Sequence, residues 1–410
     1  MSPELPFEIS VPDTKLENLH QKLALTNFPD ELDNAEWDYG VPLAEIKRLV
    51  AYWNDGYDWR AQEAKLNKEM PQFTKDINVD GFGILNIHYV HQKSSVEKAI
   101  PLLFVHGWPG SFLEVRKILP LLGQSSPEFP SFHVVAPSLP GYGFSEGANK
   151  RRFQTEQYAE VAHKLMLSLG YDEYVTQGGD WGYLITRTIA QNYGGKHSKA
   201  WHTNFPVGAP PRFSSNPVLY LQHLVTPYTS AEKVGIERTK WFITQGQGYF
   251  EQQSTKPQTL GYSLADSPVG LLAWIYEKLV AWTDAYPWTD DEVLTWIMIS
   301  YVSRAGPAAS IRIYYEAMHS ASGSFLHRLS QKPTIPFGVS HFPKEVFIIP
   351  RKLVHTIGNV VFQAEHPSGG HFAAYECPKE LVGDLRTMFG KKNPAFGVVS
   401  GKDGFDSKST

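Results

Sequence analysis

The stretch Gly178-Gly179-Asp180-Trp181-Gly182 contains a carboxylate in a position where it could do chemistry. It follows a β-prone run, Tyr174-Val175-Thr176, and precedes a run with helical periodicity from Tyr183 to Tyr193. A strand, a sharp turn and a helix in this order put Asp180 at the tip of a strained bend, where the glycines remove Cβ clashes. A carboxylate there can attack an electrophilic sp³ carbon and form an ester. The pattern alone is also typical of a plain turn, because Asp beside Gly is common in turns.

A histidine far downstream could act as the base that such a nucleophile needs. His371 lies in Gly369-Gly370-His371-Phe372, after the last predicted strand, and the two glycines allow the backbone to turn tightly. The chain has 15 histidines, so a histidine by itself would mean little. Its position after the last strand, together with the Gly-Gly turn, favours a catalytic role for His371 over a structural one.

Predicted strands alternate with helices through the middle of the chain. Residues 101–105 and 132–136 are short apolar runs, typical of strands buried on both faces, and each leads into a loop rich in Gly and Pro. This alternation predicts an α/β fold with a mostly parallel sheet and helices on both faces. Because chemistry in such sheets occurs at the carboxyl ends of the strands, we expect these loops to lie near Asp180.

The strand alternation stops between residues 206 and 335. Pro206 and two following prolines mark the boundary, and helical stretches follow at 267–282 and 290–301. We expect this insertion to form a helical cap over the active end of the sheet. The predicted division is an N-terminal extension at 1–97, a first core part at 98–205, the cap at 206–335, a second core part at 336–400 and a flexible tail at 401–410.

Composition limits the classes of function. The chain has 410 residues, of which 42% are hydrophobic and 20% are charged, as in soluble globular proteins. A formal net charge of −4 gives no electrostatic sign of nucleic-acid binding. The single cysteine, Cys377, cannot form an internal disulfide, which favours a reducing compartment. No apolar run reaches the roughly 18 residues of a membrane span, so we expect a cytoplasmic protein with no membrane anchor.

Four motifs follow one another along the chain: His106-Gly107-Trp108-Pro109-Gly110, Pro140-Gly141-Tyr142-Gly143, the stretch around Asp180, and Gly369-Gly370-His371-Phe372. Together they resemble the epoxide hydrolases of the α/β-hydrolase fold, in the branch of the microsomal and fungal enzymes. The N-terminal region is similar to the extension of that branch through Tyr57-Asp58-Trp59-Arg60. Animal microsomal members have a membrane anchor ahead of this extension. We expect none here, so residence in the endoplasmic reticulum is not implied.

The resemblance implies that an acid orients the His371 imidazole and stabilises its charged form. Glu345 follows the predicted strand at 335–340, and Glu365 follows the next predicted strand, six residues before His371. In this fold the acid lies after the strand before last, and related enzymes have an Asp or Glu after the equivalent of Phe342-Pro343-Lys344. Glu345 is therefore favoured, and Glu365 is the alternative.

An ester formed by Asp180 must be hydrolysed at its carbonyl carbon, which requires stabilisation of an oxyanion. Two backbone N–H groups can provide this stabilisation. In this fold one N–H belongs to the residue after the nucleophile, which is Trp181. By the resemblance, the other belongs to Trp108.

Opening an epoxide also requires a proton donor. Tyrosine is suitable, because its ordinary pKa of about 10 keeps it protonated near neutral pH. The related enzymes use two cap tyrosines, and the motifs around Tyr249 and Tyr314 match theirs. Helical spacing alone does not separate Tyr314 from Tyr315.

The resemblance implies an enzyme that converts a small apolar epoxide and water to a vicinal diol, with no metal or organic cofactor, and a homodimer is a further expectation. A haloalkane dehalogenase is the nearest alternative, since it shares the fold and an Asp nucleophile. Such an enzyme must bind a halide, however, and needs no tyrosine donors. A non-catalytic protein that binds a lipid-like ligand is a second alternative, but it has no need for Asp180, Glu345 and His371 together.

Overall fold

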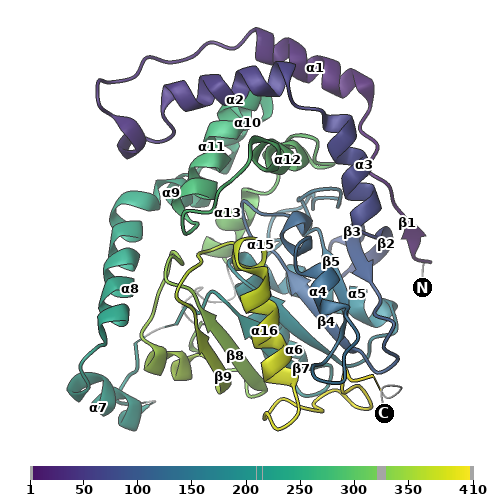
Figure 1. Cartoon of the computed structure of the whole chain (residues 1–410), viewed down its shortest axis with the longest axis vertical. Coiled ribbons are helices and arrows are strands. Elements are labelled where there is room, and N and C mark those ends of the chain that lie inside the picture. Colours follow the sequence, from purple (N-terminus) through teal and green to yellow (C-terminus); the bar gives the residue numbers. More distant parts are fainter. Residues whose placement is uncertain (1–2, 209, 215, 321–328, 407–410) are drawn as a thin grey trace.

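One central sheet connects the N-terminal region with the rest of the chain. The computed structural model describes residues 3–208, 210–214, 216–320 and 329–406. Within these residues, nine strands form a sheet in the order β1-β2-β3-β5-β4-β6-β7-β8-β9 (Figure 1). The strands are β1 (Leu5–Pro6), β2 (Gln72–Val79), β3 (Gly83–Gln92), β4 (Ile100–Val105), β5 (Phe132–Pro137), β6 (Tyr174–Gly178), β7 (Ser198–Thr203), β8 (Pro336–His341) and β9 (Asn359–Glu365).

The sheet is parallel from β5 to β9, and antiparallel from β1 to β5 through β2 and β3. All six residues of β4 are buried between β5 and β6, as its continuous apolar sequence predicts. The expected α/β fold with a mostly parallel sheet is therefore confirmed.

Helices of the core connect the strands and pack against the sheet. They are α4 (Leu119–Leu122), α5 (Thr155–Ser168), α6 (Trp181–Tyr193), α15 (Ala373–Glu376) and α16 (Pro378–Phe389). Figure 1 shows α16 in front of the sheet. Large aromatic rings fill the core beside the strands, and Trp201 of β7 stacks on Phe337 of β8 with ring centres 3.9 Å apart.

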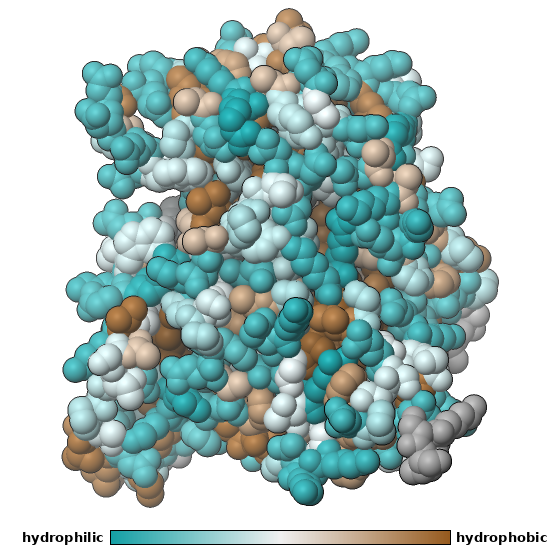
Figure 2. All heavy atoms as spheres, viewed as in Figure 1, coloured by the Kyte–Doolittle hydropathy of each residue, from teal (hydrophilic) through white to brown (hydrophobic). Residues whose placement is uncertain are grey.

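In the described residues between β7 and β8, the regular elements are all helices. They are α7 (Pro217–Val225), α8 (Ser230–Trp241), a π-helix (Phe242–Gly246), α9 (Gly248–Thr255), α10 (Pro257–Asp266), α11 (Pro268–Ala281), α12 (Asp290–Tyr301) and α13 (Arg312–Met318). Apolar side chains of α7 are exposed, and they give the hydrophobic colour at the lower left of Figure 2. Among the described residues, every helix is too short or too polar to cross a lipid bilayer.

The N-terminal extension contacts both the sheet and the inserted helices. Its helices are α1 (Asp13–Ala24), α2 (Leu43–Asp55) and α3 (Trp59–Glu69), and α1 and α2 lie across the inserted helices at the top of Figure 1. Arg48 of α2 forms an ion pair with Asp290 at 2.6 Å, and the Tyr52 hydroxyl donates to Asp291 at 2.8 Å. Because β1–β3 belong to the same sheet, the extension ties α12 to the core.

The end of the chain differs from the expected flexible tail. Ser131 N–H donates to the Gly404 carbonyl at 2.8 Å, and the Phe405 side chain is buried. Residues 401–406 therefore pack against the core, while 407–410 lie outside the described residues. Part of the predicted cap, residues 209, 215 and 321–328, also lies outside them. The other domain boundaries stay predictions.

Candidate active site

Asp180 lies in the sharp turn between β6, which ends at Gly178, and α6, which begins at Trp181. Its backbone has φ +52° and ψ −127°, a conformation that residues other than glycine rarely adopt. Such strain costs on the order of 1–3 kcal/mol and tends to occur at functional sites. The turn thus holds the carboxylate in a fixed position beyond the carboxyl end of the sheet.

One backbone N–H group contacts this carboxylate, and a second expected one belongs to the residue that follows Asp180 in the chain. Trp108 N–H, from the loop after β4, donates to Asp180 Oδ1 at 2.8 Å. A Cβ atom on Gly107 would lie only 2.3 Å from the same oxygen, so the loop can approach this closely only with glycine there. Trp181 is the first residue of α6, where N–H groups have no partner within the helix.

His371 lies between Asp180 and Glu345. Its Nε2 is 3.6 Å from Asp180 Oδ2, and its Nδ1 is 2.5 Å from Glu345 Oε1. The Glu345 side chain is only 2% exposed, whereas Glu365, at the end of β9, is 48% exposed and pairs with Arg351. The structure therefore brings Glu345, and not Glu365, to the histidine.

The charges around His371 favour its protonated form. Burial lowers the pKa of its imidazole, but the negative charge of Glu345, the hydrogen bond with Glu345 and the nearby Asp180 carboxylate outweigh burial and raise the pKa to about 10. At neutral pH the imidazolium is therefore paired with a carboxylate on either side. Part of this stabilisation depends on the charge of Asp180, so it is lost if that carboxylate is esterified.

Two tyrosines from the inserted helices lie among the aromatic rings next to Asp180. Tyr249 of α9 stacks on Trp108 with ring centres 5.1 Å apart, and Tyr314 of α13 packs edge-on against Trp181 at 4.8 Å. Burial raises the pKa of both hydroxyls well above 10, and the charge of Asp180 raises it further. Both tyrosines are therefore protonated over the whole neutral range and can donate hydrogen bonds.

The structure distinguishes the two tyrosines that periodicity left open. Tyr314 is 2% exposed, and its ring also lies 5.9 Å from that of Tyr249. Tyr315 is partly exposed and stacks instead on the ring of His319 at 4.1 Å. Of this pair, Tyr314 is the one that contacts the aromatic rings around Asp180.

Glu114 is a carboxyl group near the site that the sequence reasoning missed. A Cβ atom on Gly110 would lie 1.6 Å from Glu114 Oε1, so this carboxyl packs against the loop that carries Trp108. Burial raises the pKa of Glu114 to about 8, and the charge of His371 partly counters the rise. A glutamate inside the apolar run 112–115 was the available signal, because a buried carboxyl group is costly.

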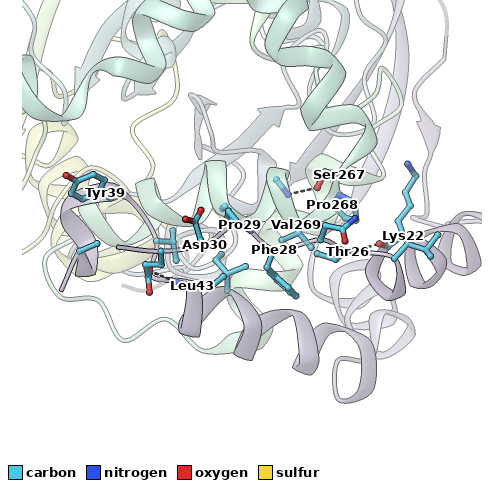
Figure 3. Close-up of a pocket in the computed structure, with 18 of the residues that line it drawn as sticks. Lys22, Thr26, Phe28, Pro29, Asp30, Tyr39, Leu43, Ser267, Pro268 and Val269 are labelled. Atoms are coloured by element: carbon cyan, nitrogen blue, oxygen red, sulfur yellow. Dashed lines mark hydrogen bonds between the residues drawn. The ribbon is translucent and has the colours of Figure 1, made fainter. Parts of the chain in front are cut away.

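A cavity of about 790 Å³ lies elsewhere, between the N-terminal extension and the inserted helices (Figure 3). Phe28, Leu43 and Val269 are among the side chains that line it. None of the seven candidate site residues does, so this cavity is separate from the candidate site. Across the described residues, His, Cys, Asp and Glu side chains nowhere form a group of three or more that could hold a metal ion.

Known proteins match almost the whole chain. A family model described as epoxide hydrolase N terminus matches residues 4–115, and one described as alpha/beta hydrolase fold matches residues 100–214. A putative epoxide hydrolase of Stigmatella aurantiaca is 37% identical over 94% of this chain and 84% of its own length. Epoxide hydrolase 1 of Sus scrofa is 35% identical over 94% of this chain and 88% of its own length.

Solved structures give the same result. The epoxide hydrolase of Aspergillus niger superposes with a TM-score of 0.80 at 35% identity, covering 94% of this chain and 96% of that protein. The juvenile hormone epoxide hydrolase of the silkworm Bombyx mori superposes with a TM-score of 0.84 at 29% identity, covering 94% and 93%. The match therefore includes the N-terminal extension as well as the sheet.

Replacing Glu345 by Gln should lower the pKa of His371, because it removes the buried negative charge that raises it most. An NMR titration of the imidazole measures this directly. The raised pKa of His371 increases the free energy of unfolding; this contribution is complete below pH 6.5 and is lost as the pH rises towards 10. The Glu345→Gln variant should therefore show a weaker pH dependence of its free energy of unfolding. Glu365→Gln is the matched control and should leave the pKa unchanged. An unchanged pKa in Glu345→Gln would contradict the assignment.

Proposed function

Because the chain belongs to the epoxide hydrolase family, which converts an epoxide and water to a vicinal diol, we propose that it works through a covalent ester on Asp180. The observation that carries this proposal is the contact of Asp180 with both Trp108 N–H and His371. The Trp108 N–H can stabilise the carbonyl oxygen of an ester, and His371 can act as the base that hydrolyses the ester. A nucleophile without the second contact would be consumed in a single turnover.

In the first step, Asp180 attacks a carbon of the epoxide ring. Its Oδ1 accepts a hydrogen bond from the N–H of Trp108, so Oδ2 is the oxygen that attacks. The C–O bond of the ring breaks, and Tyr249 and Tyr314 donate hydrogen bonds and then a proton to the departing oxygen. The result is a hydroxyalkyl ester on Asp180.

After the first step, the tyrosine that gave up its proton is reprotonated at the expense of the His371 imidazolium, so His371 is neutral. In the second step, His371 takes a proton from a water molecule that attacks the ester carbonyl. The bond between the carbonyl carbon and the diol oxygen then breaks, that oxygen takes up a proton to complete the diol, and Asp180 returns to a carboxylate beside the protonated His371. The negative charge on the carbonyl oxygen is stabilised by Trp108 N–H and Trp181 N–H. Glu345 orients the imidazole and stabilises its positive form. Esterification removes the charge of Asp180, so the pKa of His371 falls at the stage when it must act as a base.

The substrate that the site suits best is a small apolar epoxide. The rings of Trp108, Trp181 and Phe250 surround the two tyrosines, and apolar rings favour ligands without charge. The paired tyrosines favour an epoxide over a haloalkane, because a departing halide needs no proton. A cytoplasmic location and a homodimer stay predictions.

Replacing either tyrosine by phenylalanine should slow ester formation by about 10²-fold, because general-acid catalysis contributes roughly that much or more. Stopped-flow measurement of tryptophan fluorescence can follow this step, since Trp108 and Trp181 lie beside Asp180. Tyr315→Phe is the matched control and should keep the normal rate. Unchanged ester formation in both Tyr249→Phe and Tyr314→Phe would exclude them as donors.

Replacing His371 by Gln should trap the ester, because the first step needs no base and the second step does. Intact-mass measurement after incubation with styrene oxide should show protein heavier by one epoxide. The double variant with Asp180→Ala should show no increase. A His371→Gln protein that keeps its original mass, while still folded, would count against the two-step scheme.

A further inference from the structure

The loop that carries His371 is bonded directly to the inserted helices. His371 N–H donates to the Trp282 carbonyl at 2.8 Å, and Gly369 N–H donates to Asp284 Oδ2 at 3.0 Å. Trp282 and Asp284 follow α11, which belongs to the inserted helical region. The loop that carries the catalytic histidine is thus held by a distant segment, and the bond from Gly369 to Asp284 spans 85 residues.

Glu376 of α15, which follows the His371 loop, forms a further bond with the inserted helical region. Its Oε2 accepts the N–H of Asp284 at 3.0 Å. A Cβ atom on Gly370 would lie 2.4 Å from the Trp282 carbonyl oxygen and 3.1 Å from Glu376 Oε1. The two segments therefore meet at a distance that only glycine allows at position 370, immediately before His371.

The core holds the same loop on its opposite side. The Asn204 amide donates to the His371 carbonyl at 3.2 Å, and Lys344 N–H, from the loop of Glu345, donates to the Gly369 carbonyl at 3.0 Å. These bonds come from elements that follow β7 and β8. Segment 369–371 is therefore bonded to the core on one side and to the inserted helices on the other.

The Glu376 carboxyl group is costly to keep in this position. Burial raises its pKa to about 7, and the hydrogen bond from Asp284 N–H partly counters the rise. The bond from Asp284 N–H satisfies Oε2, whereas Oε1 is buried without a hydrogen-bond partner. Loss of the Asp284 contact would leave both oxygens of a buried carboxyl group unsatisfied, which is costly.

We infer that Asp284 and Glu376 are positioning residues that hold His371 in place for ester hydrolysis. Through them, the position of His371 depends on how the inserted helices pack against the core. We call this pair the histidine clamp. The clamp acts through the backbone of Gly369 and His371, and neither carboxylate is bonded to Asp180. The inference rests on the two-step scheme proposed above, because it assigns the clamp to the second step alone.

The test compares alanine variants with conservative ones. Asp284→Ala and Glu376→Ala remove the acceptor oxygens, whereas Asp284→Asn and Glu376→Gln each keep one. Single turnovers with styrene oxide, followed by fluorescence and by intact mass, give the rates of ester formation and ester decay separately. Glu380→Ala, an exposed glutamate on the next helix, is the matched control and should change neither rate.

In the alanine variants we expect ester decay to slow by about 10-fold to 100-fold, because small displacements of a catalytic group cost about this much. Ester formation should stay within about twofold of normal, so kcat and KM should fall together, since KM also falls when ester decay slows. The Asn and Gln variants should recover most of the decay rate.

Three results would overturn the inference. Normal ester decay in both alanine variants, with ester still forming, would exclude the clamp and leave the proposed function intact. Equal slowing of both steps, without recovery in the Asn and Gln variants, would mean that the residues serve only folding. Failure of the wild type and His371→Gln to form any ester would overturn the proposed function and this inference with it.

Discussion

The site is organised around the charge interaction between Asp180 and His371, whose Oδ2 and Nε2 atoms are 3.6 Å apart. While the aspartate is charged, it helps to keep the imidazole protonated. Once the aspartate is esterified, that support disappears and the imidazole can release its proton. In the proposed scheme, this contact gives the two steps their order, because His371 becomes available as a base only when there is an ester to hydrolyse.

The fold supplies the rigidity that this interaction needs. The four loops that hold Trp108, Asp180, Glu345 and His371 follow parallel strands of one sheet, so they end at the same edge. The tyrosines come from inserted helices, which are tied to the core through the N-terminal extension and through the histidine clamp. The positions of the two proposed proton donors and of the proposed base therefore both depend on how those helices pack against the core.

Local sequence predicted the parts of the site that depend on local geometry. The strained turn at Asp180 and the Gly-Gly turn before His371 are each set by a few neighbouring residues, and the apolar run of β4 predicted a buried strand. Glu345 could be favoured over Glu365 because in related enzymes of this fold the acid follows the strand before last. In each case the relevant information lies within a short segment or in the order of segments.

Long-range packing decided what sequence did not. Tyr314 and Tyr315 are adjacent residues of one short helix. The way this helix packs determines which of the two side chains contacts the rings around Asp180. The bond from Gly369 to Asp284 spans 85 residues and has no local signature. The end of the chain looked loose because residues 401–406 are mostly small and polar, yet their backbone hydrogen bonds and Phe405 pack them against the core.

The most direct test of the central claim is a single turnover in ¹⁸O-labelled water, with enzyme in excess over epoxide. If Asp180 forms the ester, the oxygen added to the first diol comes from the carboxylate, and the product carries no label. The label then enters Asp180 itself and appears in the diol only in later turnovers. Heavy oxygen in the first product molecules would show that water attacks the epoxide directly, and would contradict the ester on Asp180.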